Sequence, residues 1–318
     1  MKKQDQILLD GLEFIKKEFA DDLNLQNIIK LNQTRKIYYK FQNRIFSKKN
    51  DKTIKIKHIY IQVFNNKKIR LDVYSPKKVN KKLPCILWIH GGGMILGDAK
   101  YEKLRAIDYV KRLNCMVVCV NYRLAPEFPY PYGLEDCYAS LEWIANNSDK
   151  LNIYKERISV GGASAGAGLA AGLCLLNRNR KKFKIKFQLL IYPMINDKNT
   201  DYKNKLKPDA KIWNRESNYY AWKFYLKNFK NEKKIPIYAA PHRAKNLTKL
   251  PPAFIGVGSK DLFFEENLEY AKKLVKAGVK IELHTYANGY HGFDGSAPNA
   301  EISKRFKKDM FVILKKEI

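Results

Sequence analysis

Short runs of apolar residues alternate with helix-competent segments from about residue 83 to the end of the chain. Runs such as 116–120, which has the sequence Met-Val-Val-Cys-Val, are apolar at every position rather than at every second one. A strand of this kind is buried on both faces, which is typical of a parallel sheet covered by helices on each side. The alternation therefore predicts an α/β fold, and ligands in such folds bind beyond the carboxyl ends of the strands.

Apolar periodicity places the expected elements along the chain. We expect strands at about 56–65, 68–75, 83–89, 115–121, 157–161, 186–193, 252–258 and 279–286, and helices at about 101–113, 133–147, 164–178, 264–277 and 298–316. Two segments fall outside this alternation, because residues 1–50 have a helical spacing of apolar side chains and residues 197–248 are charged and rich in aromatic residues. We expect these two segments to form a helical cap over the strand ends, and residues 51–196 and 249–318 to form the two parts of the core.

A serine lies between two glycines where one expected strand should turn into a helix. Ser164 is the central residue of Gly-Ala-Ser-Ala-Gly (162–166), which follows the apolar run 158–160 and precedes a stretch of small residues. Such a turn holds a nucleophilic serine in a strained conformation, and glycines on both sides let the strand and the helix pass closely. Small residues in an ordinary turn would produce the same pattern. The motif therefore indicates a catalytic serine only together with partner residues elsewhere in the chain.

A second glycine-rich turn follows the expected third strand. His90 is followed by three glycines, the first two being Gly91 and Gly92, and consecutive glycines leave backbone N–H groups unobstructed. Acyl transfer passes through a tetrahedral intermediate whose oxyanion needs preorganised hydrogen-bond donors. We expect the N–H groups of Gly91, Gly92 and Ala165, the residue after the serine, to supply them. A plain glycine turn is the alternative for this motif taken alone, and the side chain of His90 is expected to be structural.

A serine nucleophile needs a base, and in enzymes with a G-x-S-x-G turn the chain order is serine, acid, histidine. Three histidines follow Ser164, namely His242, His284 and His291. His242 belongs to the inserted segment, and His284 falls in the middle of an expected strand, which favours a position on a strand face. His291 lies in a glycine-bracketed loop between the last strand and the last helix, so we favour it as the general base.

Asp261 is the candidate acid that would orient this histidine. It follows the expected strand 252–258 after two residues and so lies at the carboxyl edge, one strand before His291. An N-cap of the next helix is the alternative interpretation of this aspartate. Glu265 is the alternative acid, although a residue inside that helix points less directly at the strand ends. The candidate residues Ser164, His291 and Asp261 imply no metal and no cofactor.

With these motifs in place, the sequence resembles the hormone-sensitive-lipase-like branch of the α/β-hydrolases over about residues 55–318. The motifs that carry the resemblance are His90-Gly91-Gly92-Gly93, Asn121-Tyr122-Arg123-Leu124-Ala125-Pro126-Glu127, Gly162-Ala163-Ser164-Ala165-Gly166, Asp261 and His291-Gly292-Phe293. The resemblance implies an α/β-hydrolase fold with a mostly parallel eight-stranded sheet, flanking helices and a cap formed by residues 1–50 and 197–248. Two departures are Ala163, where the family has aspartate, and Phe263, where it usually has leucine.

The residues and the resemblance together favour a serine carboxylesterase that acts on short-to-medium acyl esters of small molecules. Ser164 would attack the ester, His291 would transfer the proton and Asp261 would orient the imidazole. Bulky residues of the cap and of the glycine turn would line the substrate pocket: Met94, Trp213, Tyr219, Tyr220 and Trp222. Packing between helices is the alternative, and the commoner, interpretation of the aromatic residues of the cap. The alternatives are a non-catalytic small-molecule receptor on the same fold and a hydrolase of amides, formamides or acetylated sugars. Arg123 and Glu127 are expected to support the fold beneath the site.

Net charge is the unusual feature of the composition. The chain has 61 lysines and arginines but only 31 aspartates and glutamates, which gives a net charge of +30. A charge of this size makes polyanion binding an alternative function. The lysines are scattered along the whole chain and accompanied by many asparagines, however, as a biased coding background would produce. We therefore expect no specific nucleic-acid partner, and a homodimer remains open.

Cysteine spacing and hydropathy indicate the cellular compartment in which the protein is expected. The chain has five cysteines, at positions 85, 115, 119, 137 and 174, which lie in apolar patterns without C-x-x-C spacing. This spacing argues against a disulfide framework and against a zinc site, and favours small core side chains. No apolar run approaches the roughly 20 residues that a membrane span needs, and the N-terminal segment lacks the apolar stretch of a secretion signal. We expect a cytoplasmic protein.

Overall fold

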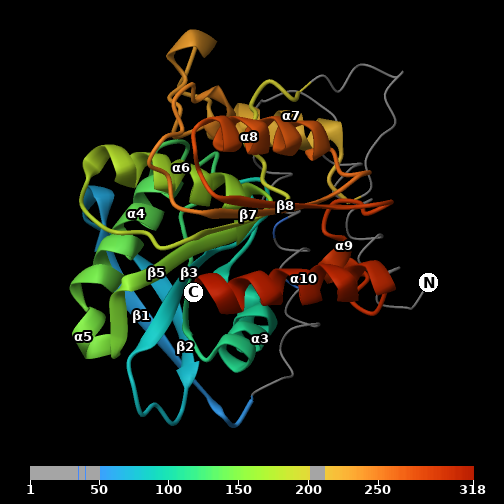
Figure 1. Ribbon diagram of the computed structural model, residues 1–318. Helices are drawn as coiled ribbons and strands as arrows, with labels where there is room; N and C mark the ends of the chain where they lie inside the picture. The colour runs from blue at the N-terminus through green and yellow to red at the C-terminus, as the bar shows by residue number, and fades with distance from the viewer. Residues whose placement is uncertain (1–34, 36–39, 41–50, 201–211) are drawn as a thin grey trace.

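The computed structural model describes residues 35, 40, 51–200 and 212–318. Within these residues, eight strands form one sheet (Figure 1). The strand order is β1-β2-β4-β3-β5-β6-β7-β8. The strands are β1 (Ile54–Val63), β2 (Lys67–Pro76), β3 (Leu83–Ile89), β4 (Met116–Val120), β5 (Ile153–Ala163), β6 (Gln188–Ile191), β7 (Ala253–Gly258) and β8 (Ile281–Tyr286). From β4 to β8 all neighbours are parallel, whereas β2 is antiparallel to both β1 and β4. The expected mostly parallel eight-stranded sheet is confirmed.

Helices cover both faces of this sheet. Figure 1 shows α4, α6 and α8 on one face and α3 and α10 on the other. The helices are α3 (Lys103–Leu113), α4 (Tyr132–Asn146), α5 (Ser148–Leu151), α6 (Ala165–Arg180), α7 (Arg215–Tyr225), α8 (Phe264–Lys276), α9 (Phe293–Ser296) and α10 (Glu301–Glu317). Short 3₁₀ helices span Phe64–Asn66, Ala99–Glu102, Glu232–Lys234 and Pro241–Arg243.

The two faces of the sheet bury two separate apolar clusters. Alternate residues of β3 illustrate the division, since Leu87 belongs to the cluster under α4, α6 and α8, while Trp88 belongs to the cluster under α3 and α10. Both side chains are at most 1% exposed. Because each face meets helices, the central strands need apolar residues at every position, which is why their sequences lack an alternating pattern.

The observed boundaries of the strands and helices differ from the expected ones mainly where strand pairing or helix capping determines them. The fifth strand begins at Ile153 instead of residue 157, because Ile153 pairs with Leu83 of β3 although the residues after it are polar. The sixth strand is shorter than expected and ends at Ile191. The short helix α9 was not expected, and it separates the loop after β8 from α10.

The expected cap is only partly described by the structure. The helical segment expected at residues 1–50 lies outside the described residues, apart from Arg35 and Lys40, which are helical. Residues 201–211 of the inserted segment also lie outside them. The described part of the insertion contains α7, and Figure 1 shows α7 close to α8, on the same face of the sheet as α6.

All five cysteines are free and buried, as expected for core side chains. Burial raises the pKa of Cys115 to about 12, so this thiol stays protonated at physiological pH. Among the described residues, no helix is long and apolar enough to cross a membrane.

Candidate active site

The turn between β5 and α6 presents Ser164 in a strained backbone conformation. Ser164 has φ 57° and ψ −122°, a region that residues with side chains rarely occupy. The flanking glycines permit the turn, because a Cβ at Gly162 would lie 2.4 Å from the carbonyl carbon of Gly166 and one at Gly166 would lie 2.1 Å from the carbonyl oxygen of Ile89. The Ser164 carbonyl oxygen accepts from the amide of Gly168 at 3.0 Å, which joins the turn to the first turn of α6. This is the geometry of a nucleophile elbow.

The glycine turn after β3 lies beside this elbow because β3 pairs with β5. A Cβ at Gly91 would lie 2.9 Å from the carbonyl oxygen of Ala163 and 3.4 Å from Cβ of Ser164. Within residues 51–200 and 212–318, the amides of Gly91 and Gly92 donate to no protein acceptor. The amide of Ala165 is the first of α6, where helical amides lack an intrahelical partner. The elbow and the adjacent glycine turn therefore carry three candidate donors for an oxyanion.

His90 holds this turn in place, which agrees with the structural role expected for it. Its Nδ1 lies 2.8 Å from the carbonyl oxygen of Gly91, and its ring stacks on Tyr122 with centroids 4.2 Å apart. The side chain is 2% exposed, and burial lowers the pKa of His90. The neutral imidazole is therefore favoured, with Nδ1–H donating to Gly91.

Ser164, His291 and Asp261 form a hydrogen-bonded series. Nε2 of His291 lies 2.9 Å from Oγ of Ser164, and Nδ1 of His291 lies 2.9 Å from Oδ2 of Asp261. The three residues are 6%, 5% and 6% exposed, so the series is largely shielded from water. With Nδ1–H donating to the carboxylate, Nε2 is left as the acceptor for the serine hydroxyl. This arrangement activates a serine for attack on a carbonyl carbon.

Neighbouring strands bring the acid and the base together. Asp261 follows β7 and His291 follows β8, and these two strands are parallel neighbours. Backbone bonds join the two loops, from the amide of Lys260 to the carbonyl of Gly289 at 2.8 Å and from that of Ser259 to Tyr286 at 2.9 Å. Oδ1 of Asp261 also accepts from the amide of Phe263 at 2.9 Å, so the aspartate supports the start of α8 as well as His291.

The residues weighed as alternatives lie elsewhere. Nε2 of His242 lies 2.7 Å from Glu269, and the ring of His284 lies on β8 between Glu282 and Asp309, at 3.6 and 3.8 Å. Glu265 is exposed on the first turn of α8.

Two aromatic rings that sequence reasoning missed enclose the imidazole of His291. The rings of Tyr192 and Phe263 lie with their centroids 4.8 and 5.1 Å from it. The Tyr192 hydroxyl donates to Asp294 at 2.7 Å, and Asp294 also accepts from Arg105 at 3.2 Å. Burial raises the pKa of Tyr192, so its hydroxyl remains a donor. No local pattern signals this contact, because Tyr192 and Asp294 are separated by 102 residues in the chain.

Glu266 is a second residue that sequence reasoning missed. Its Oε1 accepts from the amides of Ile195 and Asn196 at 2.8 and 3.2 Å, and its Oε2 accepts from Nδ2 of Asn199 at 2.8 Å. The residue is 3% exposed, and burial raises the pKa of Glu266 to about 8, against the opposing effect of these donors. One signal was available, since Glu266 occupies a position of α8 that helical spacing assigns to the buried face with Tyr270.

Replacing Glu266 with alanine is expected to lower the free energy of unfolding by about 2–4 kcal/mol, because the amides of Ile195 and Asn196 would lose a buried acceptor. The matched control is Glu265→Ala, which removes the adjacent, exposed carboxylate and should cost less than about 0.5 kcal/mol. Urea unfolding of both variants measures the difference. Equal stability of the two variants would contradict the structural role of Glu266.

The aromatic residues expected to line a substrate pocket have distinct positions. Trp213 lies against the glycine turn, because a Cβ at Gly93 would lie 2.2 Å from its indole Cη2. Tyr219, Tyr220 and Trp222 lie on α7, where Tyr220 and Trp222 are 6% and 2% exposed and Tyr219 is half-buried.

Met94 follows the glycine turn and is 2% exposed. Its φ is 62°, and its carbonyl accepts from the amide of Ala125 at 2.9 Å. This bond ties the glycine turn to the loop after β4.

Arg123 and Glu127, expected beneath the site, hold the loop after β4. Arg123 contacts both carboxylate oxygens of the buried Asp136, with the shortest distance 2.6 Å. Glu127 accepts from Arg35 at 2.5 Å, and Arg35 also donates to the carbonyls of Ile95 and Ala125 at 2.9 and 2.6 Å. A residue of the N-terminal segment thus joins this loop to the glycine turn.

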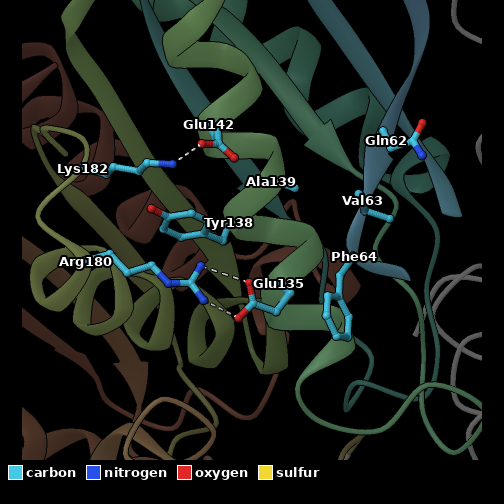
Figure 2. A pocket seen from close by; sticks show the side chains of 9 residues that line it. All are labelled: Gln62, Val63, Phe64, Glu135, Tyr138, Ala139, Glu142, Arg180 and Lys182. Atoms are coloured by element: carbon cyan, nitrogen blue, oxygen red, sulfur yellow. Dashed lines mark hydrogen bonds and ion pairs between the residues drawn. The ribbon is translucent and has the colours of Figure 1, made fainter. Parts of the chain in front are cut away.

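A separate cavity of about 530 Å³ contains none of these residues. It lies between the end of β1, α4 and the end of α6, and Figure 2 shows Phe64 across from Arg180 and Lys182. Its charged groups pair with one another, Arg180 with Glu135 at 2.6 Å and Lys182 with Glu142 at 2.8 Å. Among the described residues, no cluster of three or more histidine, cysteine or acidic side chains could hold a metal ion.

Comparison with known proteins places this chain among α/β-hydrolases. A family model described as alpha/beta hydrolase fold matches residues 86–295. Esterase LipI from Mycobacterium tuberculosis is 36% identical over 225 residues, which cover 68% of each chain. An arylesterase from Saccharolobus solfataricus is 29% identical over 228 residues, which cover 71% of this chain and 73% of that protein.

Solved structures agree with this assignment over nearly the whole chain. A bacterial heroin esterase superposes with a TM-score of 0.86 and 30% identity, covering 94% of this chain and 92% of that one. A hyperthermophilic esterase from Pyrobaculum calidifontis gives a TM-score of 0.82 and 27% identity, covering 98% and 96%.

Proposed function

The chain belongs to the hormone-sensitive-lipase-like branch of the α/β-hydrolases, and on this premise we propose that it is a serine carboxylesterase whose nucleophile is Ser164. The observation that carries the proposal is the series Asp261–His291–Ser164, with both hydrogen bonds 2.9 Å long, beside three candidate oxyanion donors. The relatives described above are esterases, and this site has the groups that ester hydrolysis requires.

In the acylation step, Oγ of Ser164 forms a bond to the ester carbonyl carbon while Nε2 of His291 takes the hydroxyl proton. The carbonyl oxygen becomes an oxyanion, which accepts hydrogen bonds from the amides of Gly91, Gly92 and Ala165. Collapse of this intermediate breaks the bond to the alcohol oxygen, and His291 returns its proton to the departing alcohol. Asp261 keeps the imidazole in the required tautomer and stabilises its charged form.

In the deacylation step, a water molecule takes the place of the alcohol. His291 accepts a proton from the water as its oxygen bonds to the acyl carbon, and the same three amides hold the oxyanion. The bond between the acyl carbon and Oγ of Ser164 then breaks, and the serine recovers its proton from His291. The products are a carboxylic acid and an alcohol, and no metal or cofactor takes part.

We further propose that α7 and its flanking residues form part of a cap that limits the acyl chain to about two to six carbons. Trp213 lies against the glycine turn, and α7 approaches the same turn through Ala221, whose Cβ would lie 3.1 Å from a Cβ at Gly93. Tyr220 and Trp222, the neighbours of Ala221 on α7, are buried and add bulk to this part of the cap. Such a pocket discriminates gradually among acyl chain lengths, since each methylene group changes the free energy of transition-state binding by roughly 1–3 kcal/mol.

A series of p-nitrophenyl esters from acetate to palmitate is expected to show the largest kcat/KM at short chains and a graded fall beyond hexanoate. Ser164→Ala protein serves as the control for background hydrolysis. A maximum at decanoate or longer would contradict the limiting role of the aromatic residues.

The same screen separates the alternatives. Acetanilides, N-formyl compounds and acetylated sugars added to the series test the amide, formamide and sugar-ester hydrolases. A non-catalytic receptor would bind one of these compounds without turnover, and the intact, hydrogen-bonded His291 speaks against that function.

A further inference from the structure

Asn218 is a polar residue on the mostly apolar buried face of α7, where Ser217 is also buried. The residues that share this face at helical spacing are Ala221, Trp222 and Tyr225, and all three are at most 2% exposed. Asn218 itself is 0% exposed. A buried amide is costly unless both its donor and its acceptor find partners, so its contacts define its role.

The two ends of the Asn218 amide bind two separate segments. Its Nδ2 donates to the carbonyl oxygen of Asn199 at 2.6 Å, and its Oδ1 accepts from the indole Nε1–H of Trp213 at 3.2 Å. Asn218 thus joins the residues that follow β6 to the residues that precede α7.

On one side this connection reaches the loop that carries the candidate acid. Nδ2 of Asn199 donates to the carbonyl of Leu262 at 3.1 Å and to Oε2 of Glu266 at 2.8 Å. Leu262 directly follows Asp261, which binds His291 at 2.9 Å.

On the other side the connection reaches the candidate oxyanion donors. The indole of Trp213 lies so close to Gly93 that a Cβ there would lie 2.2 Å from Cη2. Gly93 has φ 60° and directly follows Gly92, whose carbonyl accepts from the amide of Leu96 at 2.8 Å in the same tight turn. Trp213 therefore covers the glycine turn from the side of α7.

We propose that Asn218 is a positioning residue for the hydrolytic reaction: it orients Trp213 against Gly93 and so holds the glycine turn in the geometry that binds the oxyanion. Without Asn218, the indole N–H and the Asn199 carbonyl lose their buried partner, and Trp213 is no longer fixed. Oxyanion donors act through preorganisation, so a turn free to shift stabilises the transition state less while substrate binding changes little.

The inference rests on the proposed esterase function, and its test uses two variants of the full chain. Asn218→Ala removes the connection and leaves Trp213 unsubstituted, and Trp213→Phe removes the indole N–H donor together with the ring edge, Cζ2 and Cη2, that lies against Gly93. The matched control is Asn177→Ala, because Asn177 is also buried at 5% exposure and donates to a carbonyl, that of Phe183 at 2.7 Å, near the far end of α6.

For each protein we would measure kcat and KM on p-nitrophenyl acetate, the inhibition constant of a trifluoromethyl ketone, and Tm. The ketone forms a tetrahedral oxyanion on the serine, so its affinity reports the geometry of the donors. Asn218→Ala and Trp213→Phe should lower kcat about tenfold or more, weaken the ketone in proportion and leave KM within about twofold. Asn177→Ala should leave kcat and the inhibition constant within about twofold, even where Tm falls.

The inference is overturned if both Asn218→Ala and Trp213→Phe keep the kcat and the ketone affinity of the parent protein. It is also overturned if kcat and ketone affinity fall as much in Asn177→Ala as in Asn218→Ala. Trp213→Phe alone decides the matter where Asn218→Ala does not fold. A parent protein that hydrolyses no ester would instead contradict the proposed function, and the two failures are thereby distinguished.

Discussion

Replacing Ser164 with alanine is expected to reduce kcat for ester hydrolysis by about 10⁴-fold or more, because the residues of a catalytic triad act as a unit. The substitution removes the hydroxyl that lies 2.9 Å from Nε2 of His291 and leaves the elbow geometry to the flanking glycines. Tm should therefore stay close to that of the parent protein. The measurement is kcat on p-nitrophenyl acetate together with a thermal unfolding curve.

Ser159→Ala provides the matched control for this experiment. Ser159 lies on the same strand β5 and is 1% exposed, and its Oγ has no hydrogen-bond partner among the described residues. Its replacement should leave kcat within about threefold of the parent value. Retention of more than about one percent of activity in Ser164→Ala would show that another residue is the nucleophile.

Replacing His291 with alanine is expected to reduce kcat by a similar factor of about 10⁴ or more. No described side chain other than His291 shares a hydrogen bond with Oγ of Ser164, so its removal leaves the hydroxyl without a base. His284→Ala is the matched control, since that histidine lies on β8 beside Glu282 and Asp309. The comparison of kcat for the two variants, at a pH where the parent is most active, identifies the base.

The opposite pattern, with activity retained in His291→Ala and lost in His284→Ala, would show that the wrong histidine has been assigned. Loss of activity in both variants with unchanged Tm would mean that His284 also takes part in the reaction.

The sequence was sufficient to predict the parts of the fold that depend on local pattern. The fully apolar run at 116–120 predicted a strand buried on both faces, and β4 is such a strand. The glycines around Ser164 predicted a tight turn, and the positive φ of 57° at this serine shows why they are needed. Chain order and the edge of a parallel sheet were enough to place Asp261 near His291.

Contacts between distant segments could not be predicted in the same way. Tyr192 and Asp294 come together only because β6 and the loop after β8 end at the same edge of the sheet. The cluster of Glu266 with Asn199 depends on where the residues after β6 turn, and no periodicity encodes that. Polar residues such as Glu266 and Asn218 at buried helical positions were the only local signal of these networks.

The measurement that tests the assignment of Ser164 most directly is covalent labelling with an alkyl p-nitrophenyl phosphonate, which transfers its phosphonyl group to an activated serine and releases p-nitrophenol. Intact-mass and peptide mass spectrometry then locate the group on the chain. The predicted result is one phosphonyl group per chain, on the peptide containing Ser164, with loss of esterase activity in proportion to labelling and no labelling of Ser164→Ala. A phosphonyl group on a different residue of the inactivated enzyme would contradict the account.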